Sequence, residues 1–272
     1  MCPPDFYGIQ YEINPWMDRR RGADQARARE QWDHLRRVLT EDAGAAVELA
    51  TPRAGLPDMV FTANAGYCEG GLVILSRFRY SERAGEEAPF QRWFRGHGFQ
   101  VALLPEGMYF EGEGDLLPCG EALCGGYRYR SDIRSHLAVS ELIGREVLSL
   151  ELVDPRFYHL DTCFCPLDSG SAVYYPGAFD RYGRRVLRAL VPDLIAAPRK
   201  EALRFGCNAI VVGRRVVMNT GCPSLRRELE DRGYAVHEVE LSEYIKAGGS
   251  AKCLTMFLDR PGLHQETRSQ ST

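Results

Sequence analysis

The chain has 272 residues, of which 44% are hydrophobic and 26% charged, and its formal net charge is −3. This length and composition are typical of a globular protein with a large buried core. The slightly acidic balance argues against nucleic acid as a partner, since nucleic-acid binders normally carry a basic patch. No run of 18 apolar residues occurs, so we expect no membrane span. Residues 1–5 lack the basic-then-apolar pattern of a signal peptide, and we therefore expect a cytoplasmic protein.

The cysteines favour the same compartment. Nine are present, an odd number, and none forms a Cys-x-x-Cys pair. Disulfide frameworks and zinc sites both need paired cysteines at characteristic spacings. We therefore expect buried, reduced thiols and no zinc site.

The predicted elements begin, in chain order, with a strand, a helix and a strand at 7–13, 24–39 and 46–50. Four units of one pattern follow, each a strand–turn–strand hairpin, then a helix, then a short apolar strand. Their hairpins span 59–76, 115–129, 162–176 and 208–220. Their helices and last strands span 87–96 and 99–104, 131–144 and 146–152, 180–190 and 194–198, and 223–233 and 235–241. A final strand at 251–258 completes a single domain at 1–260, and 261–272 is expected to be a flexible tail.

The repeat predicts the fold class. Hairpin turns centred near residues 70, 119, 169 and 213 are 49, 50 and 44 residues apart, a period typical of radial or solenoidal arrays. We expect an α/β protein in which the last strand pairs with the first. That pairing would close a ring of five modules and leave no open sheet edge. The alternative is an ordinary open α/β sheet.

Four motifs fall at the inner strand ends, which would converge on the central channel of such a ring. They are Phe-Thr-Ala-Asn (61–64), Phe-Glu-Gly-Glu-Gly-Asp (110–115), His-Leu-Asp-Thr (159–162) and Gly-Gly-Ser-Ala-Lys-Cys (248–253). In this order they resemble the guanidine-modifying enzymes, the pentein family of arginine deiminases, dimethylarginine dimethylaminohydrolases, amidinotransferases and arginine dihydrolases. The resemblance extends over nearly the whole chain. It implies a five-bladed α/β propeller of ββαβ modules, which agrees with the repeat.

The resemblance implies roles for individual residues. Cys253 matches the family's nucleophile and His159 its general acid/base. Glu111 matches a carboxylate that holds guanidinium nitrogens, and Asp161 matches the acid two residues after the histidine. Arg130 matches an arginine that contacts the substrate.

Two further residues are candidates, and the family match is loose at Arg83. Arg83 aligns with an arginine that binds the α-carboxylate of the substrate. Asp115 has two interpretations, as a substrate ligand or as the cap of a turn. Glu113 is expected to be a solvated loop acid. Lys252 would point away from Cys253 if the two residues alternate along a strand.

The chemistry of guanidinium explains why these residue types belong together. Its carbon is a poor electrophile until carboxylates accept its N–H groups and hold it. A thiolate is the best nucleophile available at neutral pH, and the cationic substrate would lower the pKa of the thiol. A histidine must then protonate the departing ammonia and deprotonate the incoming water. This scheme passes through a covalent thiouronium on the cysteine and requires no metal or organic cofactor, only a small-molecule substrate.

Each assignment has a competing structural interpretation. A cysteine in a strand is usually a core residue, and Glu111 could be a solvated loop acid. Arg130 and Arg83 could be surface residues. The other histidines, His34, His97, His136, His237 and His264, look like surface or tail residues.

Two features distinguish the subfamilies. Deiminases carry an acid in the Phe-Thr-x-Asp motif, where this chain has Asn64. The sequence Asn14-Pro15-Trp16-Met17 resembles the Asn-Pro-Trp-Met of arginine dihydrolases, which take arginine to ornithine, carbon dioxide and two ammonia. Neutral amides at Asn14 and Asn64 could hold citrulline for a second round, since an amide both donates and accepts. The structural alternative is that Asn14 caps the following turn.

The sequence therefore predicts a hydrolase of linear amidines, with arginine dihydrolase as the first choice. A deiminase or dimethylargininase that stops at citrulline is the alternative within the family. An amidinotransferase is less favoured because it needs room for a second substrate and usually a longer chain. A non-catalytic ring protein that binds a cationic ligand is the alternative of another class.

Overall fold

The computed structural model describes residues 1–259, so the expected tail at 261–272 lies outside the described residues. Four three-stranded sheets dominate it, and each joins an antiparallel hairpin to a third strand that runs parallel to the second. The sheets are β1(Gly66–Glu69)-β2(Leu72–Leu75)-β3(Gln100–Ala102), β4(Leu116–Cys119)-β5(Ala122–Tyr127)-β6(Val147–Glu151), β7(Phe164–Pro166)-β8(Ser171–Tyr174)-β9(Asp193–Ala196) and β10(Ile210–Val212)-β11(Arg215–Asn219)-β12(Ala235–Val239). All four predicted hairpins are confirmed.

Helices make the crossovers between the second and third strands, because a parallel connection needs a dozen or more residues. The main crossover helices are α3(Glu87–Gly96), α4(Ile133–Ile143), α5(Arg181–Leu190) and α7(Pro223–Asp231). The other helices are α1(Gln25–Arg37), α2(Ser81–Ala84), α6(Arg199–Ala202) and α8(Ser242–Ile245). Short helical turns lie at Val38–Asp42, Pro57–Val60, Thr62–Ala65, Gly112–Gly114, Leu160–Thr162 and Pro176–Ala178.

Local chemistry explains where these elements begin and end. The turn of the first hairpin uses Gly70 and Gly71 at φ 58° and 83°, the left-handed backbone that a tight hairpin favours. Asp132 and Asp180 cap α4 and α5 by accepting backbone N–H groups of the first turn. Gly144 ends α4 in the left-handed conformation, as its position predicts.

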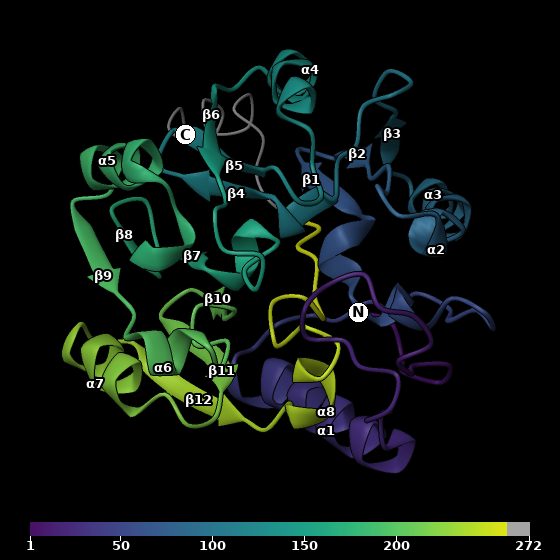
Figure 1. The fold of residues 1–272 in the computed structure, drawn as a ribbon, viewed down its shortest axis with the longest axis horizontal. Helices are drawn as coiled ribbons and strands as arrows, with labels where there is room; N and C mark the ends of the chain where they lie inside the picture. The colour runs from purple at the N-terminus through teal and green to yellow at the C-terminus, as the bar shows by residue number, and fades with distance from the viewer. Residues whose placement is uncertain (260–272) are drawn as a thin grey trace, which may run out of the picture.

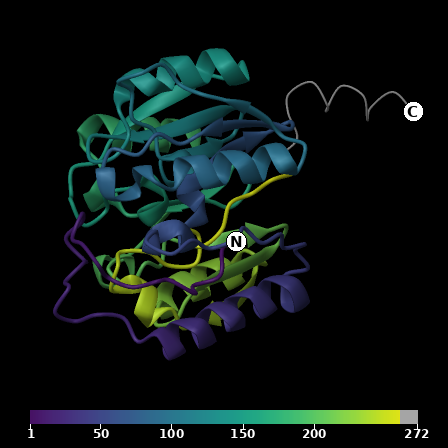
Figure 2. The same cartoon turned by 90° about the vertical axis from the view of Figure 1, so that its right-hand side faces the viewer.

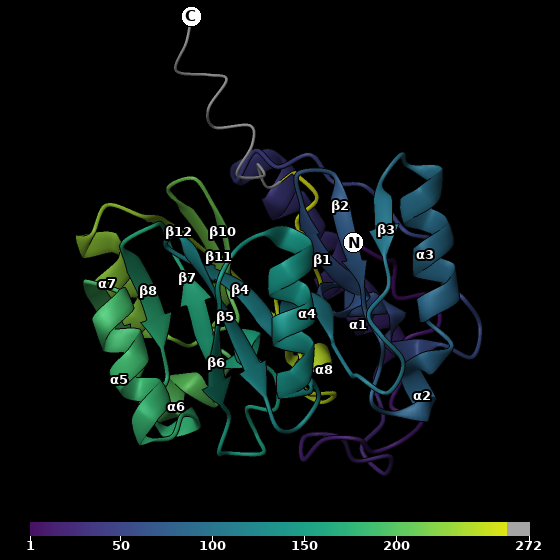
Figure 3. The same ribbon diagram turned by 90° about the horizontal axis from the view of Figure 1, so that it is seen from above.

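The modules are arranged around a common centre (Figure 1). The helices α1, α3, α4, α5 and α7 lie at the periphery, and β1, β4, β7 and β10 lie nearer the centre. Seen from above, α5 and α3 stand at opposite sides of the molecule with the strands between them (Figure 3). The predicted α/β propeller is thereby confirmed for four of the five modules.

The fifth module differs from its prediction. Within residues 1–259 the segments 7–13, 46–50 and 251–258 form no strand. The last segment coils instead, because the N–H groups of Leu254 and Thr255 bond to carbonyls three or four residues back. The two ends of the chain still meet: the Tyr7 and Tyr244 rings lie 4.8 Å apart, and α1 runs beside the C-terminal part of the chain (Figure 2).

Two expectations about buried residues can be compared with the structure. All nine cysteines lie within the described residues, and all are buried and outside disulfides, as predicted. The surface position expected for His136 is wrong, since the ring is 3% exposed and its Nδ1 lies 2.7 Å from Ser149 Oγ. Among residues 1–259, none of the helices combines the length and apolar character that a membrane crossing needs.

Candidate active site

The candidate site lies where the modules begin. The turns Thr62–Ala65, Gly112–Gly114 and Leu160–Thr162 each lead directly into the first strand of a hairpin. Side chains of neighbouring turns meet: the Asn64 amide donates to the carbonyl of Glu111, and His159 Nε2 lies beside Glu111 Oε2. The coiled segment that contains Cys253 joins them, and its carbonyl accepts the N–H of Ala63 at 3.1 Å.

Cys253 is buried and held by two polar side chains. Its Sγ lies 3.3 Å from Asp161 Oδ2, and the Asn208 amide nitrogen donates to the sulfur at 3.1 Å. Burial, reinforced by the Asp161 carboxylate, raises the pKa of the thiol well above its ordinary value. Without a bound cation Cys253 is therefore a thiol at neutral pH.

Asp161 is the acid two residues after the histidine, and it is completely buried. Burial raises the pKa of its carboxyl to about 7. Its Oδ1 has no hydrogen-bond partner within the described residues. A buried carboxylate oxygen without a partner is costly, so this atom is suited to accept a donor from a ligand.

His159 and Glu111 form a second buried pair. The Nε2 atom of His159 lies 2.8 Å from Glu111 Oε2, and Arg130 Nη1 donates to the same oxygen at 3.0 Å. Burial opposes the ionisation of Glu111, but Arg130 and His159 outweigh it and hold the pKa of this carboxyl far below its usual range. Arg130 is itself enclosed between the rings of Tyr80 and Tyr158.

Asp115 holds the backbone around this pair. Its Oδ2 accepts the Ser131 hydroxyl at 2.6 Å, and its Oδ1 accepts the N–H of Leu160 at 3.1 Å. Burial raises the pKa of Asp115 to about 6. The carboxyl thus links Ser131, whose hydroxyl accepts the backbone N–H of Glu111, to the turn that follows His159.

Asn64 and Arg83 make a third cluster. Arg83 Nη1 donates to Asn64 Oδ1 at 2.8 Å, and Asn64 Nδ2 donates to the carbonyl of Glu111 at 3.2 Å. Two other nitrogens of the guanidinium bond to Glu86, each at 2.8 Å. Arg83 is 3% exposed, so its alternative as a surface residue is wrong.

Asn14 lies apart from this centre, on the wall of a pocket of about 480 Å³ that Arg130 and Tyr158 also line. Its Oδ1 accepts the N–H of Trp16 at 2.9 Å, and its Nδ2 donates to the carbonyl of Ala247 at 3.0 Å. The first contact is the turn-capping role expected as the structural alternative. The second ties the N-terminal loop to the segment before Cys253.

The expectation that Glu113 is solvated is wrong, and so is the strand expected around Lys252. Glu113 is fully buried rather than solvated, and its Oε2 lies 2.6 Å from Lys252 Nζ. Lys252 does not alternate with Cys253 along a strand, because this segment is coiled. The ion pair joins residues from different modules. The sequence pattern of a loop does not predict so distant a partner.

Two polar residues of the site, Asn208 and Asp58, were not among the predicted ones. Asn208 begins the fourth module and bonds Cys253. Asp58 is 2% exposed, its backbone carbonyl accepts Arg83 Nη2 at 3.1 Å, and its Oδ1 has no partner among residues 1–259. Asn208 occupies the same position in its module as Asn64 and Asp161 occupy in theirs. This repeat could have identified Asn208 as a site residue. In the described part of the chain, no group of three or more His, Cys, Asp or Glu side chains could hold a metal ion.

A family model and several known proteins match this chain. The family model for "N,N dimethylarginine dimethylhydrolase, eukaryotic" matches residues 10–259. A bifunctional arginine dihydrolase/ornithine cyclodeaminase of Nostoc sp. is 47% identical over 266 residues, which is 96% of this chain and 38% of that protein. An N(G),N(G)-dimethylarginine dimethylaminohydrolase of Mycobacterium tuberculosis is 41% identical over 94% of this chain and 84% of its own length.

A solved structure extends the comparison to the fold. The N-terminal domain of ArgZ, a cyanobacterial arginine dihydrolase, was crystallised as a cysteine-to-serine mutant bound to substrate. It matches with a TM-score of 0.93 and 46% identity, over 96% of this chain and 97% of that one. This chain spans less than two fifths of the two bifunctional relatives that it matches, 38% and 37% of their lengths. The matched model and these relatives show that the chain belongs to the N,N-dimethylarginine dimethylhydrolase family.

Proposed function

We propose that this protein is an arginine dihydrolase, which converts L-arginine and two water molecules to ornithine, carbon dioxide and two ammonia. The observation that carries the proposal is the meeting of two buried pairs in one site, Cys253 with Asp161 and His159 with Glu111. Asn64, an amide beside these acids, favours the dihydrolase over a deiminase. The 47% identity to a protein named as an arginine dihydrolase supports the same choice.

The first step in this scheme is capture of the guanidinium group. The carboxylates of Asp161 and Glu111 accept its N–H groups and fix its carbon beside the sulfur. The positive charge of the substrate then offsets the burial that keeps Cys253 protonated, so the thiol gives its proton to His159 and thiolate forms as the substrate binds. Sγ bonds to the guanidinium carbon and begins the covalent reaction.

His159 moves the protons in the following steps. It donates to the departing nitrogen as the C–N bond breaks, and ammonia leaves a thiouronium on Cys253. The same ring then accepts a proton from water, which attacks the carbon and breaks the C–S bond. Glu111, kept ionised by Arg130, stabilises the imidazolium that exists before the first transfer and again after the second.

A second round distinguishes the dihydrolase from the deiminase. The ureido product is neutral, and it presents a carbonyl acceptor beside N–H donors. An amide can meet both, whereas a carboxylate at the same place repels the carbonyl. Asn64 therefore retains citrulline within reach of Cys253, and Asn14 holds the N-terminal loop that lines the neighbouring pocket.

The amino-acid end of the substrate lies toward Arg130, Arg83 and Asp58 in this proposal. Two guanidinium groups suit an α-carboxylate. Asp58, buried and with an oxygen that has no partner within residues 1–259, suits the α-amino group. Such a zwitterion-binding set favours a free amino acid over agmatine, which has no carboxylate.

A dimethylargininase or deiminase is the second candidate within the same chemistry. The matched family model and the mycobacterial relative, 41% identical, favour dimethylarginine as its substrate. A non-catalytic cation-binding ring is the candidate of another class. It would leave two buried titratable pairs in one site without a use.

Product analysis tests the proposal. The purified protein is incubated with arginine while ornithine, citrulline and ammonia are followed together. Ornithine with two ammonia per turnover supports the dihydrolase, and citrulline with one ammonia moves the protein to the deiminases. Turnover of dimethylarginine alone supports the second candidate. A thiol reagent that labels Cys253, with protection by arginine, separates all three enzymes from the binding protein.

A further inference from the structure

A buried ion pair stands directly behind the nucleophile, and the scheme above gives it no role. Lys252 Nζ lies 2.6 Å from Glu113 Oε2, and the two residues are 5% and 0% exposed. Lys252 also donates to the carbonyl of Thr255 at 3.2 Å, while Glu113 accepts the N–H of Phe257. Removing two charges from water is expensive, so such a pair is weak evidence of a stabilising role.

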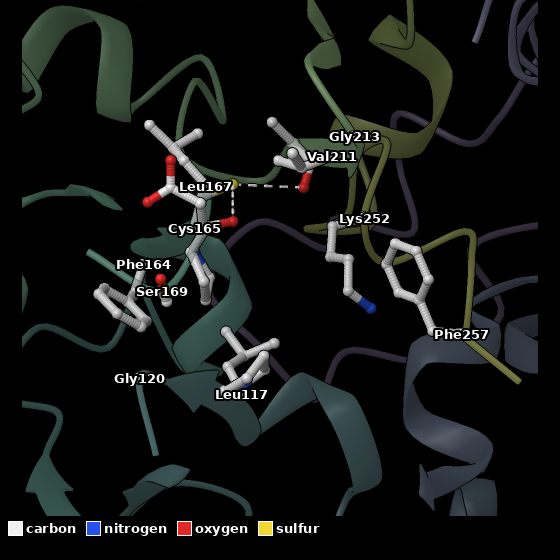
Figure 4. A pocket seen from close by; sticks show the side chains of 14 residues that line it. Leu117, Gly120, Phe164, Cys165, Leu167, Ser169, Val211, Gly213, Lys252 and Phe257 are labelled. Atoms are coloured by element: carbon white, nitrogen blue, oxygen red, sulfur yellow. Dashed lines mark hydrogen bonds between the residues drawn. The ribbon is translucent and has the colours of Figure 1, made fainter. Parts of the chain in front are cut away.

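Lys252 lies on the opposite side of the coil from the reaction centre. Its side chain extends into a pocket of about 510 Å³ at the hairpin ends, beside Phe257 and facing Cys165 and Leu167 (Figure 4). The neighbouring residue Cys253 is directed at Asp161 instead. The backbone N–H of Lys252 bonds to the Asn208 carbonyl at 3.2 Å, and the Asn208 amide donates to the Asp161 carbonyl at 2.9 Å, so Lys252 and Asp161 belong to one buried cluster.

The charges around Asp161 make Lys252 decisive. Burial raises the pKa of this carboxyl, and Lys252 is the leading influence that lowers it, ahead of the hydrogen bonds from Cys253 and Asn208. Glu113 acts in the opposite direction and raises it. Cys253, Cys163, Cys165 and Tyr158 also interact with Asp161, and burial raises their pKa values, so they are neutral at physiological pH. The His159–Glu111 ion pair begins two residues before Asp161.

We propose that Lys252 is a positioning residue whose charge, adjusted by Glu113, keeps Asp161 a carboxylate that faces Cys253 and the substrate guanidinium. This inference rests on the proposed function for its catalytic consequence. An ionised Asp161 accepts guanidinium N–H groups and balances their charge. A protonated Asp161 would leave a buried cation with one counter-charge fewer.

Three variants test the proposal. Lys252→Met removes the charge at similar length, Lys252→Arg keeps it, and Glu113→Gln removes the opposing carboxylate. The matched control is Lys246→Met, because Lys246 makes the same 2.6 Å contact with a buried glutamate, Glu243, away from Asp161. The measurements are kcat/KM and KM for arginine against pH, and infrared titration of Asp161, assigned with Asp161→Asn.

The variants should move the titration in opposite directions. Lys252→Met raises the midpoint of Asp161, and with it the acid limb of kcat/KM, by about 1 pH unit or more. KM for arginine near neutral pH then rises about tenfold. Glu113→Gln lowers the midpoint, Lys252→Arg returns it close to that of the wild type, and Lys246→Met leaves it unchanged.

A purely structural role predicts a different pattern. Activity would then fall by the same factor at every pH, Lys252→Arg would not rescue it, and the Asp161 midpoint would stay in place; this pattern overturns the proposal. Should Lys252→Met fail to fold, the opposite shift in Glu113→Gln still decides the matter. Should the wild type not act on arginine, the proposed function fails, while the infrared titration still decides whether Lys252 controls Asp161.

Discussion

Both polar atoms of the Asn208 amide group contact Cys253. The Oδ1 atom of Asn208 accepts the backbone N–H of Cys253 at 3.2 Å, and Nδ2 lies 3.1 Å from Sγ. The same nitrogen donates to the carbonyl of Asp161 at 2.9 Å. An N–H aimed at sulfur favours thiolate, so Asn208 lowers the pKa of Cys253 against the burial that raises it.

Replacing Asn208 with alanine should therefore slow the attack of the thiolate. We expect kcat to fall about 100-fold, the order seen when one donor to a developing or resident anion is removed. Alkylation of Cys253 by iodoacetamide should also require a higher pH. Asn219→Ala is the control, because Asn219 is equally buried but bonds Arg204 and Leu241. An equal loss of kcat in the control would assign the effect to packing.

Gly114 is a steric requirement of the site. A Cβ atom there would lie 2.2 Å from Asn64 Nδ2 and 3.3 Å from the His159 ring. Gly114→Ala must therefore displace Asn64, and an error of about 1 Å in such a group costs on the order of 100-fold in rate. Gly96→Ala is the control, since a Cβ atom there meets nothing within 4 Å. Steady-state kinetics with arginine compares the two, and retention of full activity in Gly114→Ala would contradict the site.

The amide of Asn64 should decide where the reaction stops. In Asn64→Asp the new carboxylate pairs with Arg83 and loses the N–H that reaches the carbonyl of Glu111. It repels the ureido carbonyl, so we expect citrulline to accumulate and the ratio of ornithine to citrulline to fall at least about tenfold. Chromatography of the products measures this ratio. Unchanged ornithine output would remove the role given to the amide.

Asp115 should make folding stability fall as the pH rises. Its folded pKa is about 6, whereas an unfolded aspartate titrates near about 3.9, so the folded state holds the extra proton between these values. The stabilisation is complete below about pH 4 and is lost by about pH 6, a change on the order of 2–3 kcal/mol. The asparagine in Asp115→Asn does not titrate, so this variant lacks that pH-dependent contribution to the unfolding free energy.

Urea unfolding of both proteins across this window measures the effect. The difference in unfolding free energy between Asp115→Asn and the wild type should shift in favour of the variant as the pH rises. Buried acids away from Asp115 titrate in the same way in both proteins, so their contributions cancel. A difference that stays constant across the window would show that Asp115 has an ordinary pKa.

The sequence by itself determined the repeating architecture and the ends of many elements. Helix α3 spans Glu87–Gly96, the range that periodicity predicts, and the first hairpin turns at Gly70 and Gly71. These features are local: turn glycines, capping aspartates and apolar spacing act within a few residues of themselves. The sequence also offered Cys253 and His159 as candidates, because their motifs resemble those of the guanidine-modifying enzymes in the same order along the chain.

Only the tertiary structure decided what contacts connect the modules. Glu113 pairs with Lys252, which is 139 positions away, and Asn208 with Cys253, 45 positions away. It also showed that the last segment coils rather than pairing as a strand, which turns Cys253 toward Asp161. Buried charged and amide side chains are costly without a partner, and for Glu113 and Asn208 that partner comes from another part of the chain. Local patterns in the sequence carry no information about such partners, and the closed ring supplies them.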